Sequence, residues 1–167
     1  MADERKFNGP VTFNGKLVTP SVSVTGTKSL TANDCGKTVF WTKSGGHHIT
    51  LPAPAAGLYF KIVIAVGSNS SHKIKVATEG THYFFGNVTV ASTTNNKQAT
   101  QNVDKSTAGT SAEDYEAIEL RSNTSTTGGQ AGDVVEIWGV DSTSWLVKAD
   151  LSTAQAAPAS LTTIQAA

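Results

Sequence analysis

Short stretches of apolar or alternating residues run through this chain, and Gly, Asn, Ser and Pro separate them. Alternation places successive side chains on opposite faces of an extended strand. Turn-forming residues between such stretches are typical of consecutive short strands. The pattern predicts strands at Ser21–Thr25, Thr38–Thr42, His47–Leu51, Leu58–Val66, His72–Thr78, Phe84–Val90, Tyr115–Leu120, Asp133–Val140 and Trp145–Ala149.

The strongest of these signals is Leu58–Val66, which is almost continuously apolar and lies between Gly57 and Gly67. Its β-branched and aromatic residues favour a strand covered on both faces over a buried helix. A turn follows it, so His72–Thr78 is expected to return as the antiparallel neighbour of this strand.

The clearest hairpin joins Asp133–Val140 to Trp145–Ala149. Two polar stretches, 92–114 and 122–132, contain few large apolar residues and are expected to be loops. Loops of that length inside a compact domain usually carry a function.

The two ends of the chain differ from its middle. Residues 1–27 and 151–167 contain too little apolar material for a core and are expected to be extended arms around a domain at 28–150. The alternating Ser21–Thr25 has too little apolar surface to be ordered alone. It must lie on its own domain, on a neighbouring copy or on a partner.

Length and composition set the fold class. A chain of 167 residues with 38% apolar and 16% charged residues suits one domain with a thin core. Thr favours extended backbone, and Ser, Asn and Gly favour turns. The prediction is an all-β protein: an antiparallel β-sandwich, a small jelly-roll or a β-barrel, with an arm at each end.

Charge and hydropathy exclude several partners. Thirteen basic and thirteen acidic residues leave no basic surplus for nucleic acid, and a net charge of zero is compatible with self-assembly. The longest apolar run, Ile62–Val66, is too short to cross a membrane. The charged N-terminus, without an apolar segment after it, indicates synthesis in a cytoplasm without secretion.

Cys35 and the glycine-rich Gly128–Gly132 offer little chemistry. Cys35 lies in a turn without flanking basic residues, so a buried or half-buried small residue is the interpretation, against a nucleophile. Gly128–Gly132 precedes a strand and lacks the helix that would hold a phosphate, so it is interpreted as a turn.

The four histidines do not form a ligand pattern. His47 and His48 are adjacent and would point to opposite faces of a strand, while His72 and His82 lack partners at metal-ligand spacing. Ordinary surface or turn histidines are the interpretation, with a shared site on an oligomer axis as the alternative. No metal and no cofactor are expected.

The carboxylates Glu113, Asp114, Glu116 and Glu119 cluster before and within one predicted strand. A glycosidase needs two carboxylates across a cleft in different environments. Neighbours on one strand more often form a solvated edge. No catalytic residues are therefore predicted, and the chain is not expected to be an enzyme.

Trp138 and Trp145 flank the predicted hairpin. Aromatic faces at such positions can form a platform for sugar rings. The alternative, which we favour, is that both anchor a thin core.

Two segments carry a resemblance. Ser29–Phe40 (SLTANDCGKTVF) and His48–Phe60 (HITLPAPAAGLYF) resemble successive segments of virion proteins of tailed bacteriophages, and the hairpin near the end of the domain is similar to their closing strands. The resemblance spans about residues 28–150. It implies a small β-sandwich or β-barrel module of a phage head or fibre, without catalytic residues.

The chain lacks the long repeats of a tail fibre, and this favours a capsid decoration, or cement, protein. Such a protein is expected on the outer surface of the capsid, as a homotrimer that bridges neighbouring major capsid proteins. The N-terminal arm would contact the capsid through Arg5, Lys6 and Phe7. The alternative is a host-recognition or glycan-binding module of a head or tail fibre, which would use the two polar loops and Trp138 or Trp145.

Overall fold

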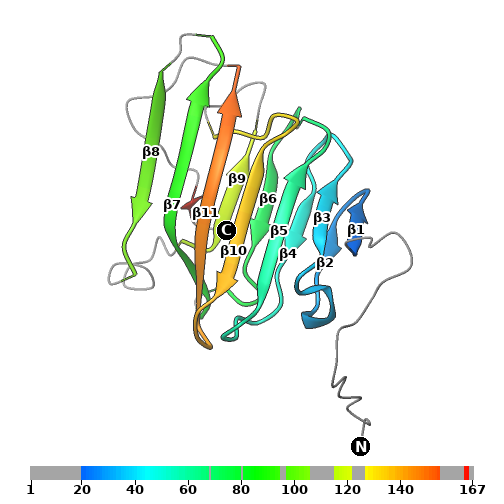
Figure 1. The fold of residues 1–167 in the computed structure, drawn as a ribbon, viewed down its shortest axis with the longest axis vertical. Helices are drawn as coiled ribbons and strands as arrows, with labels where there is room; N and C mark the ends of the chain where they lie inside the picture. Colours follow the sequence, from blue (N-terminus) through cyan, green and yellow to red (C-terminus); the bar gives the residue numbers. More distant parts are fainter. Residues whose placement is uncertain are drawn as a thin grey trace, which may run out of the picture.

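A computed structural model describes residues 20–67, 69–79, 81–94, 97–105, 115–121, 127–154 and 164–165. These residues form two β-sheets, one behind the other in Figure 1, and one turn of 3-10 helix, η1 (Ala32–Asp34). The seven-stranded sheet contains, in spatial order, β1 (Ser21–Val24), β3 (Thr38–Trp41), β5 (Tyr59–Ile64), β10 (Val134–Gly139), β11 (Ser144–Thr153), β7 (Tyr83–Ser92) and β8 (Gln98–Val103). The five-stranded sheet contains β12 (Ile164–Gln165), β9 (Ala117–Leu120), β6 (His72–Lys75), β4 (His48–Thr50) and β2 (Lys28–Ser29). The all-β prediction is confirmed.

The first six strands alternate between the two sheets. Strands β1, β3 and β5 lie side by side in the seven-stranded sheet and run parallel, while β2, β4 and β6 do the same in the five-stranded sheet. The chain therefore winds as a coil, crossing from one sheet to the other at each turn. The expected hairpin between Leu58–Val66 and His72–Thr78 is wrong, because the turn after β5 leads into the opposite sheet.

The prediction of antiparallel sheets is wrong, because both sheets are mixed. Five of the ten strand pairings within the described residues are parallel. The longest parallel pairing joins β11 to β7, from Ser144 opposite Tyr83 to Thr153 opposite Ser92. The predicted hairpin of β10 and β11 is confirmed.

Strand β8 lies within the stretch 92–114 that the sequence assigns to a loop. It is an edge strand of its sheet and, within the described residues, pairs with β7 alone. An edge strand buries little of its surface, so β8 needs few large apolar residues. Val103 is the buried apolar residue at its end.

The core lies between the two sheets. Trp41, Trp145 and Phe60 from the seven-stranded sheet belong to the same buried cluster as Ile49 and Ile74 from the five-stranded sheet. Strand β5 follows this arrangement, since its residues are alternately buried and half-buried. Its apolar run predicts a strand covered on both faces, but one face of β5 is buried and the other is only half-buried.

Parts of both predicted arms belong to the sheets. Strand β1 pairs with β3, so the chain's own domain is the surface that covers it. Strand β11 continues to Thr153, and β12 pairs with β9. The remaining residues of the arms, 1–19, 155–163 and 166–167, lie outside the described residues, and the proposed contact residues Arg5, Lys6 and Phe7 are among them. Within the described part of the chain, no helix is long and apolar enough to span a membrane.

Candidate functional site

The face of the seven-stranded sheet that is turned away from the five-stranded sheet, here the outer face, carries its side chains in transverse rows. Strand register places Tyr59 of β5 beside Trp138 of β10, Trp138 beside Leu146 of β11, and Leu146 beside Phe85 of β7. All four side chains are half-buried. We call this set the aromatic row.

The next row along the same face is polar. Register places Glu136 between Lys61 and Lys148, and continues from Lys148 to Asn87 and then Asn102. Lys148, Asn87 and Asn102 are exposed. This polar row alternates in charge near its centre and ends in two amides.

An open hollow of about 650 Å³ lies where the two rows meet over β10, β11, β7 and β8. We call it the outer hollow. Residues that line it are Gly86, Asn87, Asn102, Trp138, Leu146 and Lys148.

Gly86 lines the hollow, and its φ of 126° lies in the region that residues with a side chain rarely adopt. A Cβ at this position would overlap the backbone oxygen of Val147 on β11. Close approach of the two strands therefore requires glycine here.

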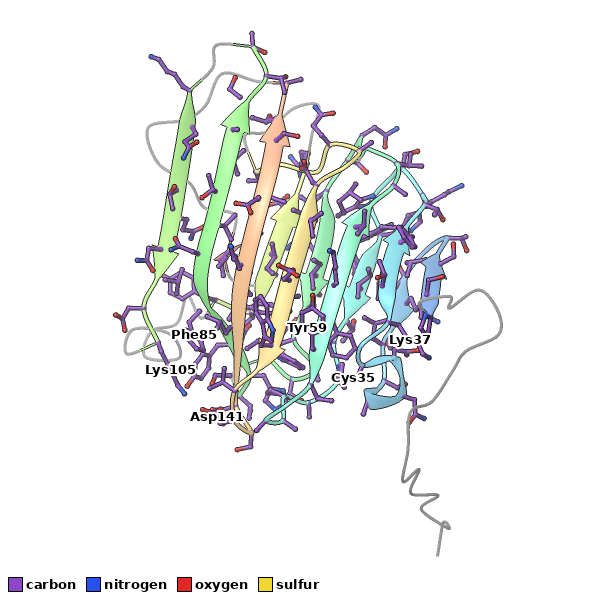
Figure 2. The ribbon with its side chains drawn as sticks, in the orientation of Figure 1. Cys35, Lys37, Tyr59, Phe85, Lys105 and Asp141 are labelled. Atoms are coloured by element: carbon purple, nitrogen blue, oxygen red, sulfur yellow. The ribbon has the colours of Figure 1, made fainter. Side chains whose placement is uncertain are left out.

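Tyr59 fixes one side of the aromatic row, and Figure 2 shows it near the middle of the outer face. Its ring lies 5.4 Å from that of Trp138, at an interplanar angle of 33°. Its hydroxyl donates a 2.6 Å hydrogen bond to Glu136 Oε1. Burial, followed by this carboxylate, raises the pKa of Tyr59 to about 12. The phenol thus remains a neutral donor at physiological pH.

A charged pair closes the other end of the aromatic row. Lys105 Nζ lies 5.6 Å from the centre of the Phe85 ring and 2.5 Å from Asp141 Oδ2. Figure 2 shows the three side chains gathered at one end of the sheet. Asp141 also accepts hydrogen bonds from the backbone N–H groups of Thr143, in the turn before β11, and of Ser144, the first residue of β11. The Lys105 contact, with these backbone bonds, holds the pKa of Asp141 well below its usual range.

Comparison with known proteins gives no family assignment. No protein-family model, curated protein or solved structure matches the chain. Its function has to be argued from its own residues.

The two predicted platform residues lie on opposite faces of the sheet. Trp145 is fully buried and meets Phe60 edge-on, with 5.9 Å between ring centres. Trp138 is half-buried on the outer face. The interpretation as a core residue is confirmed for Trp145. A platform made of both rings is wrong, because Trp138 is the register partner of Leu146, and the side chain of Trp145, one position earlier, leaves the opposite face of the sheet.

Two histidines predicted at the surface are buried. His72 is fully buried and stacks on Trp41, with ring centres 4.2 Å apart, and His82 is 8% exposed. His72 Nε2 lies 2.9 Å from Lys43 O, and its Nδ1 accepts from the backbone N–H of His47. Burial lowers the pKa of His72. The described residues contain no group of three metal-ligating side chains.

The described carboxylates of the predicted cluster do not face each other across a cleft. Glu116 is buried, while Glu119 accepts a hydrogen bond from Ser71 and lies 3.2 Å from Arg121. Glu113 and Asp114 lie outside the described residues.

Cys35 is half-buried, as predicted, and its sulfur accepts a hydrogen bond from the backbone N–H of Tyr59. The backbone of the turn at Gly128–Gly132 binds a carboxylate of the same chain, that of Asp133. Asp133 Oδ2 accepts from the N–H groups of Gly129 and Gln130 at 2.8 and 3.0 Å.

Sequence reasoning missed most of the outer hollow. Asn87, Asn102 and Lys148 occupy outward positions of their strands, which alternation alone indicates. Their neighbourhood depends on the parallel pairing of β7 with β11, and no local signal in the sequence shows that pairing.

Proposed function

We propose that this chain is a non-enzymatic structural protein of a tailed phage virion, a capsid decoration protein that forms a homotrimer and bridges major capsid proteins. Its two mixed sheets would make it a variant of the β-sandwich. The support comes from the two segments of sequence that resemble phage virion proteins and from their contact in the fold.

The observation that carries the proposal is that these two segments form one unit. Gly36 N, in the first segment, donates a 2.9 Å hydrogen bond to Tyr59 O in the second, and Tyr59 N donates to Cys35 Sγ at 3.3 Å. Within the first segment, Asp34 at the end of η1 accepts hydrogen bonds from the backbone N–H and the hydroxyl of Thr31, the residue before η1. The resemblance thus falls on two segments that pack together, and this supports the proposal.

The mechanism would be mechanical. Each trimer adds contacts between capsid subunits, and these contacts must be broken before the shell can open. A few kcal/mol per bridge suffices because many copies act on one particle. Arg5, Lys6 and Phe7 remain the proposed capsid contact.

The test measures the temperature at which phage heads release DNA, with and without the purified protein. We expect the protein to raise it, and a variant with Ala at Arg5, Lys6 and Phe7 to lose the effect. Lys16→Ala, in the same N-terminal segment, serves as the control. An unchanged release temperature, together with a monomeric mass in solution, would refute the proposal.

A further inference from the structure

The outer hollow combines an apolar floor with a polar side. Leu146 and the backbone at Gly86 form part of the lining, and Trp138 adds an aromatic ring. Asn87 and Lys148 line the same space and are exposed. A ligand that fits must therefore present one apolar face and one hydrogen-bonding edge.

The polar side is suited to hydroxyl groups. Asn87 and Asn102 are register partners on β7 and β8, so their amides lie next to each other. An amide carries two donors and an acceptor, and can therefore both give and receive hydrogen bonds with a hydroxyl. Within the described residues, neither amide is engaged in a hydrogen bond.

The aromatic ring is held in place before any ligand arrives. Tyr59 packs at 5.4 Å against Trp138 and is itself fixed by its hydrogen bond to Glu136. A ring that is already positioned loses little conformational entropy when it is covered. The C–H face of a sugar ring is apolar and weakly positive, which suits the negative face of an indole.

Two other kinds of ligand fit less well. Strands β7 and β11 are paired on both sides, so a peptide cannot add to them as a further strand. Among the described residues of the lining, Lys148 is the one with a charged side chain, and the oppositely charged Glu136 lies beside it in the polar row. An anionic ligand would lack the several donors that such sites use.

We propose that the outer hollow is a binding site for a neutral oligosaccharide, with one sugar stacked on Trp138 and the neighbouring hydroxyls bonded to Asn87 and Asn102. Its volume of about 650 Å³ accommodates a ligand of two or three sugars. Such a site goes beyond capsid bridging, because it would give the particle affinity for glycans on a cell surface.

The experiment screens the full chain on an array of bacterial surface glycans and titrates it with maltotriose, cellotriose and triacetylchitotriose. Binding is followed by saturation-transfer NMR and by tryptophan fluorescence. We expect at least one neutral glycan to bind and Trp138→Ala to weaken that binding by about tenfold or more. Phe40→Ala is the matched control, because Phe40 is an aromatic residue of the same sheet, 39% exposed and outside the hollow.

A second pair of variants separates loss of binding from loss of the fold. Asn87→Ala and Asn102→Ala should keep the unfolding temperature and weaken binding. Absence of binding to every glycan overturns the proposal, as does binding that Phe40→Ala reduces and Trp138→Ala does not. If Trp138→Ala instead breaks an oligomer, the hollow is a subunit contact and the glycan proposal fails. Capsid stabilisation is measured separately, so either proposal can fail alone.

Discussion

Ser152 donates two hydrogen bonds to a single carboxylate oxygen of Asp133, from its backbone N at 3.0 Å and from its Oγ at 2.7 Å. The other oxygen of Asp133 is bonded to the N–H groups of Gly129 and Gln130. Burial raises the pKa of Asp133, and the four hydrogen bonds oppose that shift. One buried carboxylate thus joins the glycine-rich turn and β11 to the start of β10.

Replacement of Asp133 should destabilise the fold strongly. Asp133→Ala leaves four donors without their acceptor, and we expect the free energy of unfolding to fall by about 3 kcal/mol. Ser152→Ala removes only the hydroxyl bond and should cost about 1 kcal/mol. Chemical denaturation measures both. Asp150→Ala, at an exposed position of β11, is the control and should have little effect; equal losses for Asp133→Ala and Asp150→Ala would contradict this account.

Gly86→Ala should destabilise the fold for two reasons, the backbone conformation at this position and the lack of room for a Cβ. The φ of 126° is strained for alanine, and the added Cβ would overlap the backbone of Val147. We expect a loss of about 3 kcal/mol in the free energy of unfolding. Gly26→Ala is the matched control, since nothing lies within 4 Å of its added Cβ. Similar unfolding midpoints for the two variants would show that β7 and β11 do not approach as described.

His72 should make the protein less stable in acid. Its folded-state pKa is lowered, chiefly by burial, whereas in the unfolded chain a histidine binds a proton near pH 6.5. Below that pH the unfolded state therefore binds more protons than the folded state, and stability falls as the pH falls. The slope from this group is at most about 1.4 kcal/mol per pH unit.

The measurement is the free energy of unfolding between pH 7.5 and 5. His72→Phe keeps an aromatic ring against Trp41 and should flatten the pH dependence, although it loses the hydrogen bonds to Lys43 and His47. His48→Gln, at an exposed position, should keep the slope of the original protein. A slope that survives in His72→Phe would assign the acid sensitivity to another group.

Gln101 should hold the C-terminal strand through its side chain. Its Nε2 donates to Ile164 O at 2.9 Å, and its Oε1 accepts from Ile164 N at 2.8 Å. Ile164 is 1% exposed, so these backbone groups would be left without partners in Gln101→Ala. We expect that variant to lose about 1 to 2 kcal/mol of stability and to expose the amides of β12 to hydrogen exchange. Gln98→Ala, an exposed position on the same strand, should exchange as the original protein does.

The sequence was informative about strands and poor about their partners. The continuous apolar run between Gly57 and Gly67 located β5, and the turn Asp141–Ser144 identified the hairpin of β10 and β11. It assigned β6 to the wrong neighbour, because a turn of Gly67–Ser71 can return within a sheet or cross to another. Polar β8 was missed because an edge strand buries little. Trp138 was found as a candidate, while Asn87 and Asn102 join it only through pairings between residues far apart in the chain.

The central place of β11 has a consequence for synthesis. This strand lies between β10 and β7 in the seven-stranded sheet, yet it follows the six other strands of that sheet in the sequence. Before β11 has left the ribosome, no strand connects the pair β7 and β8 to the part of the sheet that contains β1, β3 and β5. The two halves of the sheet can join only after the residues of β11 have been synthesised, and such distant pairings are slow to form. Until β11 has been synthesised, nascent molecules therefore have the edges of β7 and β10 open to other chains.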